Sequence, residues 1–93
     1  MDLPVNYDQT HYTVRKLVRE EYERIQGGNC WFCNCPLSGS IGKKASGKKI
    51  KTNLFPKQFF KWPKHLHHDR KTGLTIGTVH AACNAVLWQY HGQ

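Results

Sequence analysis

Long apolar runs are missing from this sequence. No stretch approaches the roughly 20 consecutive apolar residues of a membrane span. The first ten residues also lack the basic start and the apolar run of an export signal. We therefore expect a protein with no membrane partner that stays in the cytoplasm, or in the host cytoplasm if it is viral, and is not secreted.

Acidic residues are almost absent from the larger part of the chain. Every Asp and Glu except Asp69 lies at or before Glu23, so residues 24–93 carry eleven Lys or Arg and one acid, a local net charge of +10. A field of that sign indicates a polyanionic partner, and the alternative is a solvated basic surface. The lysines are interleaved with Gly, Ser and aromatic residues, which favours nucleic acid.

The chain is short for a protein held together by an apolar core alone. Its 93 residues make one domain, 1–93, near the size at which a disulfide or metal clip is needed. The four cysteines could form two disulfides. In a reduced cytoplasmic protein, however, closely paired cysteines favour zinc.

Two close pairs of residues have the spacing of a tetrahedral zinc site: Cys30-x2-Cys33 and His80-x2-Cys83. Four protein ligands leave no open position, so we expect a structural zinc ion. The alternative is four buried residues without metal. Cys35 and His91 could compete as ligands, and we expect Cys35 to be a free thiol.

The first expected element is a helix over residues 8–26 that packs on the core. Asp8 or Thr10 would cap its start, and Gly27-Gly28 would end it. A contact between two copies in a homodimer is an alternative role. The apolar residues at helical spacing are Val14, Leu17, Val18 and Ile25, with Tyr22 beside them.

The rest of the chain, residues 28–93, is expected to complete a small α+β fold. In order, the pattern predicts a knuckle at 30–36, a flexible basic loop or loose hairpin at 38–53, an aromatic-rich segment at 54–63, strands at 65–69 and 74–79, and a helix at 81–90 that opens near Asn84.

Residues suited to phosphodiester cleavage surround the expected zinc site. His68 could be the general base, since an unperturbed imidazole titrates near neutral pH. His67 and Asn84 could ligate a divalent ion such as Mg²⁺ or Mn²⁺. Neighbouring residues of a regular strand point to opposite faces, so both histidines reach one phosphate only if the strand ends or twists there. The alternatives are basic surface histidines and an Asn84 that caps the last helix.

Residues 65–84 read His-Leu-His-His-Asp-Arg-Lys-Thr-Gly-Leu-Thr-Ile-Gly-Thr-Val-His-Ala-Ala-Cys-Asn. This stretch resembles the HNH (His-Me finger) nucleases, and within them the branch of the phage recombination endonuclease VII, whose pattern runs H-L-D-H-D-H-K-T-G-x-V-R-G-L-L-C-x-x-C-N. With Cys30-x2-Cys33 included, the resemblance covers about residues 28–90. It implies a zinc-stapled, treble-clef-like ββα-metal fold and metal-dependent cleavage of DNA.

The resemblance also implies residue roles. His68 would be the general base, Asn84 a ligand of the catalytic ion, and His67 the second ligand in place of the family's Asp. His80 would replace a zinc-binding Cys. His65 would contact the phosphate or be an ordinary polar strand residue.

One role in the family stays unassigned. Many members have an Asn on the second strand that orients the base, and the nearby positions here hold Thr75 and Thr78.

The sequence therefore predicts a small HNH endonuclease that hydrolyses DNA with one divalent ion. A zinc-bound nucleic-acid-binding module without activity is the main alternative. A homing nuclease is a third, but its chain would be longer. Contacts to the DNA backbone are expected from Lys43, Lys44, Lys48, Lys49, Lys51, Lys57, Lys61, Lys64, Arg70 and Lys71.

Overall fold

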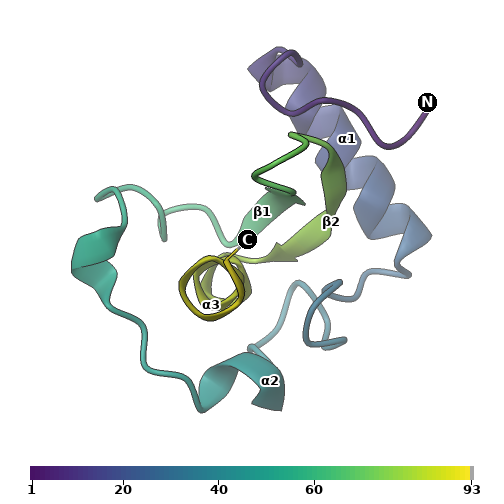
Figure 1. Cartoon of the computed structure of the whole chain (residues 1–93). Coiled ribbons are helices and arrows are strands. Elements are labelled where there is room, and N and C mark those ends of the chain that lie inside the picture. Colours follow the sequence, from purple (N-terminus) through teal and green to yellow (C-terminus); the bar gives the residue numbers. More distant parts are fainter. Residues whose placement is uncertain (93) are drawn as a thin grey trace.

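A two-stranded antiparallel sheet stands between helices in the computed structural model, which describes residues 1–92 (Figure 1). None of the described helices has the length and apolar character to cross a membrane. The elements in chain order are α1 (Tyr12–Ile25), α2 (Lys43–Ser46), the short 3-10 helix η1 (Thr52–Leu54), β1 (Lys64–His68), β2 (Thr75–His80) and α3 (Ala81–His91).

The two strands form a hairpin whose bounds differ by one residue from those expected. Lys64 pairs with His80 at one end, and the Asp69 carboxylate accepts hydrogen bonds from two backbone N–H groups of the turn at the other end. The register shifts between His67, opposite Gly77, and His68, opposite Thr75. One extra residue of β2 thus forms a β-bulge, which twists the ladder locally.

Helix α1 begins later than the sequence suggested. Its N-cap is His11, whose ring nitrogen accepts a hydrogen bond from the Thr13 N–H at 3.3 Å. The expected caps Asp8 and Thr10 were wrong. The Thr10 hydroxyl instead donates to the Asn6 carbonyl at 2.6 Å within the preceding turn. The helix ends at Ile25 before two glycines with positive φ, as expected.

Helix α1 buries only part of its apolar surface. Val18 and Tyr22 are buried with Leu66 of β1 in a small core that we call the helix side. The other expected core positions were wrong, because a two-stranded sheet covers only a narrow strip of the helix. The exposed fractions are 43% for Val14, 53% for Leu17 and 59% for Ile25. The homodimer contact expected for this helix stays a prediction.

A second, larger core surrounds the cysteines, and we call it the cysteine side. It joins the knuckle, α2, β2 and α3 through Cys30, Leu37, Ala45, Val79, Cys83, Val86 and Leu87.

The expected flexible loop at 38–53 instead contains α2 and part of η1. Ala45 is buried in the cysteine side and anchors the segment. The Gln89 side chain of α3 bonds the backbone of Lys49 and Lys51, at 3.1 and 3.0 Å.

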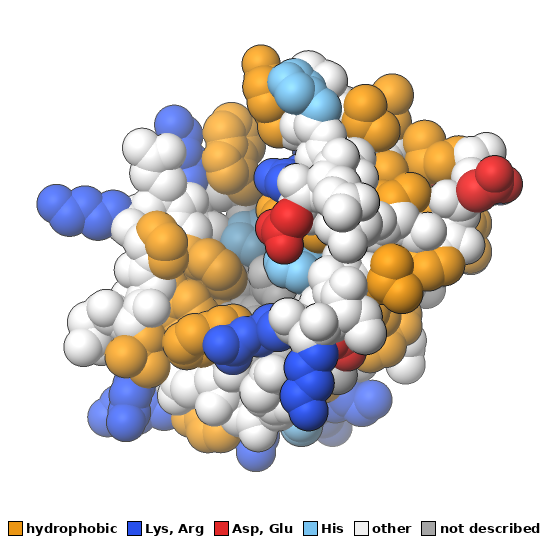
Figure 2. Space-filling model, turned by 45° about the horizontal axis from the view of Figure 1, so that its top comes forward, with side chains coloured by type: hydrophobic (Ala, Val, Ile, Leu, Met, Phe, Trp, Pro, Cys, Tyr) orange, Lys and Arg blue, Asp and Glu red, His pale blue; other side chains and the backbone are white. Residues whose placement is uncertain are grey.

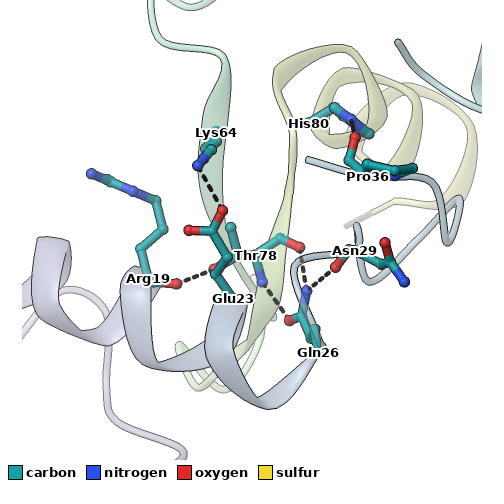
Figure 3. A network of polar contacts seen from close by, with 8 residues as sticks. All are labelled: Arg19, Glu23, Gln26, Asn29, Pro36, Lys64, Thr78 and His80. Atoms are coloured by element: carbon teal, nitrogen blue, oxygen red, sulfur yellow. Dashed lines mark hydrogen bonds and ion pairs between the residues drawn. The ribbon is translucent and has the colours of Figure 1, made fainter. Parts of the chain in front are cut away.

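A polar network fixes α1 to the sheet (Figure 3). The Thr78 hydroxyl donates to the Arg19 carbonyl at 2.7 Å. The Gln26 side chain bonds both backbone groups of Thr78 at 2.9 Å, and Lys64 pairs with Glu23 at 2.6 Å. The network holds α1 so that the Arg19 and Lys64 side chains rise on the same side of the helix.

The N-terminal segment runs beside the hairpin turn (Figure 1). The Tyr7 N–H donates to the Gly73 carbonyl at 2.8 Å, and the Thr75 N–H donates to the Val5 carbonyl at 2.9 Å. Asn6 forms an isolated antiparallel bridge with Leu74. This short pairing extends the sheet and brings the ring of Tyr7 to the end of β1.

Candidate functional site

The structure gathers the four expected metal ligands of the cysteine side. The Sγ atoms of Cys30, Cys33 and Cys83 and a ring nitrogen of His80 all lie within 4.8 Å of one another. The knuckle turns tightly because the Cys30 N–H donates to the Cys35 carbonyl at 2.8 Å. His80 ends β2, and Cys83 lies in the first turn of α3, so the hairpin–helix junction presents the second pair.

The distances fit a tetrahedral ion. His80 Nδ1 lies 3.4 Å from the Cys33 sulfur and 3.6 Å from the Cys83 sulfur. A tetrahedral zinc ion with Zn–S of about 2.3 Å and Zn–N of about 2.1 Å would hold S and N about 3.6 Å apart. His80 Nε2 donates to the Pro36 carbonyl at 2.9 Å, which leaves the Nδ1 lone pair facing the sulfurs. The group could therefore bind a structural metal such as zinc.

The thiols of Cys30 and Cys83 form a hydrogen bond with each other. This bond lowers the pKa of Cys30 and raises the pKa of Cys83. The direction of the first shift favours the thiolate of Cys30, the form in which a cysteine binds metal. Cys35 and His91, the two residues expected to compete as metal ligands, lie outside the group. Cys35 is a free cysteine. The His91 ring packs edge-on against Phe32, with centroids 5.7 Å apart.

A second group of residues lines a cleft of about 1000 Å³ bordered by α1, β1 and α3. His65, His67, His68 and Asn84 all border this one cavity. Figure 2 shows His side chains inside a hollow, with hydrophobic and basic side chains around its rim. The structure therefore brings together the four residues that the sequence proposed for catalysis.

Asn84 connects two of these histidines. Its Oδ1 lies 3.3 Å from His67 Nδ1, and its Nδ2 donates to His65 Nδ1 at 3.1 Å. Asn84 does not cap the helix, because the N-cap position is His80 and Asn84 lies inside α3. Its side chain is therefore available to the histidines of β1.

The pair of His67 Nδ1 and Asn84 Oδ1 fits the spacing of ligands to a small divalent cation. Two adjacent donors of an octahedral ion, each about 2.1 Å from it, are about 3.0 Å apart. The observed 3.3 Å is close to that separation. The amide oxygen suits Mg²⁺ or Mn²⁺, and the imidazole nitrogen suits softer ions such as Ni²⁺ better, so the pair is a partial set for a divalent ion, completed by water and substrate oxygens.

His68 borders the same cleft, and the shift in register falls between it and His67. Its ring stacks on Tyr7, with centroids 4.0 Å apart and planes inclined by 12°. Burial lowers the pKa of His68, and the nearby Asp8 carboxylate and Leu66 carbonyl partly oppose that shift. Burial also lowers the pKa of His65. Both rings are thus neutral at neutral pH, as a proton acceptor must be.

The cations of the cleft come largely from an unexpected element. Of the expected DNA-binding residues, only Lys64 and Arg70 border it, and three more cations come from α1: Arg15, Lys16 and Arg19. Sequence reasoning treated α1 as a packing helix and missed them. Arg19 follows Lys16 by three residues and Arg15 by four, and both spacings bring side chains together on one helix face; that was the available signal. The other expected residues lie outside the cleft and are exposed: Lys43, Lys44, Lys48, Lys49, Lys51, Lys57, Lys61 and Lys71.

Comparison with models of known families, with curated proteins and with solved structures finds no match to this chain.

Proposed function

We propose that the protein is an HNH-type, ββα-metal endonuclease that hydrolyses DNA phosphodiester bonds with one divalent ion. One observation carries the proposal. The Asn84 side chain reaches from α3 to His67 and His65 of β1, inside a cleft that also contains His68 and five cationic side chains. A packing contact alone would not require this combination of nitrogen and oxygen donors, a neutral imidazole and positive charge at one cavity.

The chain's own residues would act on a water molecule and a phosphate. His68 accepts a proton from water, whose oxygen forms a bond to phosphorus as a P–O ester bond breaks. The leaving oxygen takes a proton from solvent. His67 and Asn84 would hold a Mg²⁺ or Mn²⁺ ion, which offsets negative charge on the phosphate. His65 hydrogen-bonds to Asn84 and thereby orients that amide.

The cleft cations would hold the DNA backbone. Arg15, Lys16 and Arg19 border the cleft from α1, and Lys64 and Arg70 border it from the hairpin. Glu23 neutralises part of the Lys64 charge. Contacts of this kind go to phosphates, so they give affinity without a choice of sequence. The exposed lysines of 43–51 would add to the same field at longer range.

The four-ligand group would hold zinc and position the site without entering the reaction. Its four protein ligands leave no open position for substrate. Asn84 directly follows the ligand Cys83 in the first turns of α3. Zinc bound there would fix the part of the helix from which Asn84 reaches β1.

Cleavage of plasmid DNA by metal-stripped, zinc-reloaded protein tests the proposal. We expect nicked or linear product with Mg²⁺ or Mn²⁺, none with the zinc-loaded protein when no such ion is added, and a loss of roughly 10²-fold or more in His68→Ala. His91→Ala is the matched control, since His91 is exposed and outside both the cleft and the metal group. DNA affinity of the zinc-loaded proteins, measured without added Mg²⁺ or Mn²⁺, should be the same for both variants.

Two results would contradict the proposal. Cleavage that EDTA does not affect would exclude the role of the divalent ion. Binding of DNA without cleavage of supercoiled, linear, branched or single-stranded forms, with Mg²⁺, Mn²⁺, Co²⁺ or Ni²⁺, would instead support a zinc-bound nucleic-acid-binding module.

A further inference from the structure

The ring of Tyr7 lies between His68 and Arg15. The His68 ring stacks on it at 4.0 Å, and the Arg15 guanidinium carbon lies 3.9 Å from the same ring centroid. Two groups this close to one centroid cannot share a face, so they occupy opposite faces. We propose that Tyr7 is a positioning residue that holds the general base His68 in its reactive orientation. This inference rests on the proposed function.

Tyr7 is itself fixed by the backbone. Its N–H donates to the Gly73 carbonyl at 2.8 Å, and its carbonyl accepts from Arg15 Nε at 2.9 Å. The first bond ties Tyr7 to the turn of the hairpin, and the second ties it to α1. Because Tyr7 is attached to both the hairpin turn and α1, its ring can restrain the His68 ring. A tyrosine on an unattached segment would move together with the histidine.

His68 has a particular need for such a restraint. It is the last residue of β1 and sits at the bulge, where the ladder is irregular. Asn84 bonds His65 and His67 and thereby orients those two rings. The stack on Tyr7 fixes the plane of the third ring. It covers a face of the ring and leaves the ring edge uncovered, where one nitrogen bonds the Leu66 carbonyl and the other remains for the reacting water.

The second strand does not supply this restraint. The Thr75 hydroxyl is engaged by the Tyr22 hydroxyl at 2.9 Å and by the Val5 N–H at 3.0 Å. The Thr78 hydroxyl donates to the Arg19 carbonyl at 2.7 Å. Both threonines thus serve the attachment of α1 and the N-terminal segment, and the restraint on His68 comes from that segment instead.

The test compares Tyr7→Phe, Tyr7→Leu and the control Tyr90→Leu, an exposed tyrosine outside the cleft. Stacking needs the ring and not the hydroxyl. We therefore expect Tyr7→Phe to keep wild-type kcat and Tyr7→Leu to lose kcat by roughly 10- to 100-fold, since small misplacement of a reacting group is costly. KM should stay constant in all three.

A second readout is independent of cleavage. In zinc-loaded protein without Mg²⁺ or Mn²⁺, the imidazole proton resonances of His68, assigned by their loss in His68→Ala, should shift in Tyr7→Leu because the ring current is removed. They should stay in place in Tyr90→Leu. Zinc content and circular dichroism report whether each variant is folded.

The outcomes separate the two proposals. Failure of the wild-type protein to cleave any DNA overturns both. A cleaving wild type whose Tyr7→Leu variant has equal kcat overturns only the role of Tyr7. The same follows if Tyr7→Leu raises KM alone, or if Tyr7→Phe, which preserves the stack, loses as much kcat as His68→Ala.

Discussion

The cysteine side and the helix side of this molecule are stabilised by different means. The cysteine side gathers four metal-ligating residues inside its own apolar core. The helix side has three buried residues, a polar network to Thr78, and an apolar strip left in solvent. The hairpin belongs to both, and the cleft lies where they meet. One side is therefore expected to depend on a metal, and the other on direct packing.

Loss of the four-ligand group is expected to have the largest effect. Structural zinc contributes roughly 10–16 kcal/mol to the folding of small zinc domains, so Cys83→Ser or strong chelation should unfold the cysteine side. Metal analysis and near-ultraviolet circular dichroism measure this. Cys35→Ser is the control and should keep both metal and fold, since its thiol is outside the group. A well-folded wild type without zinc would contradict the prediction.

Loss of the Asn84 bridge should come next. Asn84→Ala and His67→Ala are expected to weaken the use of the divalent ion by roughly 10²-fold, with partial recovery in excess Mn²⁺. Cleavage rates over a series of metal concentrations measure this effect. Gln89→Ala, on the same helix but bonded to Lys49, is the control. An unchanged metal dependence in Asn84→Ala would refute ligation by this residue.

On the helix side, truncating a buried and an exposed valine of α1 should have different effects on the free energy of unfolding. Val18→Ala removes buried methyl groups and should lower the free energy of unfolding by about 2 kcal/mol. Val14 is 43% exposed, so Val14→Ala should change it by less than about 0.5 kcal/mol. Denaturant unfolding of the zinc-loaded proteins measures both. Equal effects would mean that Val14 is covered in solution, as in the predicted homodimer.

The smallest expected effect is on DNA affinity, when cations that border the cleft are removed and compared with cations outside it. Lys16→Ala with Arg19→Ala removes two cleft cations, and should lower DNA affinity roughly 10-fold and reduce the salt slope by about 2. Lys48→Ala with Lys49→Ala removes two exposed charges outside the cleft, and should have a smaller effect. Binding titrations of the zinc-loaded proteins without added Mg²⁺ or Mn²⁺, at several salt concentrations, provide the measurement. A larger loss in the second pair would place the main DNA contact on 43–51.

Local spacing predicted those parts of the molecule that depend on neighbours in the chain. The two metal-ligand pairs, the hairpin and the final helix follow from residues three to six positions apart, and the structure has them with small shifts at their ends. The twist required at the histidine pair is present as a bulge.

Features that depend on distant segments were missed. Helical spacing marks Val14 as apolar but cannot show how wide a surface will cover the helix. The same limit hid Arg15 and Arg19, which border the cleft only because Thr78 and Gln26 fix the rotation of α1. Tyr7 had no signal at all, since its contact with His68 spans sixty-one positions.

Because of the bulge, β2 has one residue more than β1 across the paired stretch. His67 faces Gly77, and a regular ladder would place His68 opposite Ile76, whereas the structure places it opposite Thr75. Deleting Ile76 would remove the bulge, give the hairpin a regular register and take away the local twist at the end of β1, where His68 lies. Activity should therefore be sensitive to a one-residue deletion in β2, even at a position whose side chain is outside the cleft.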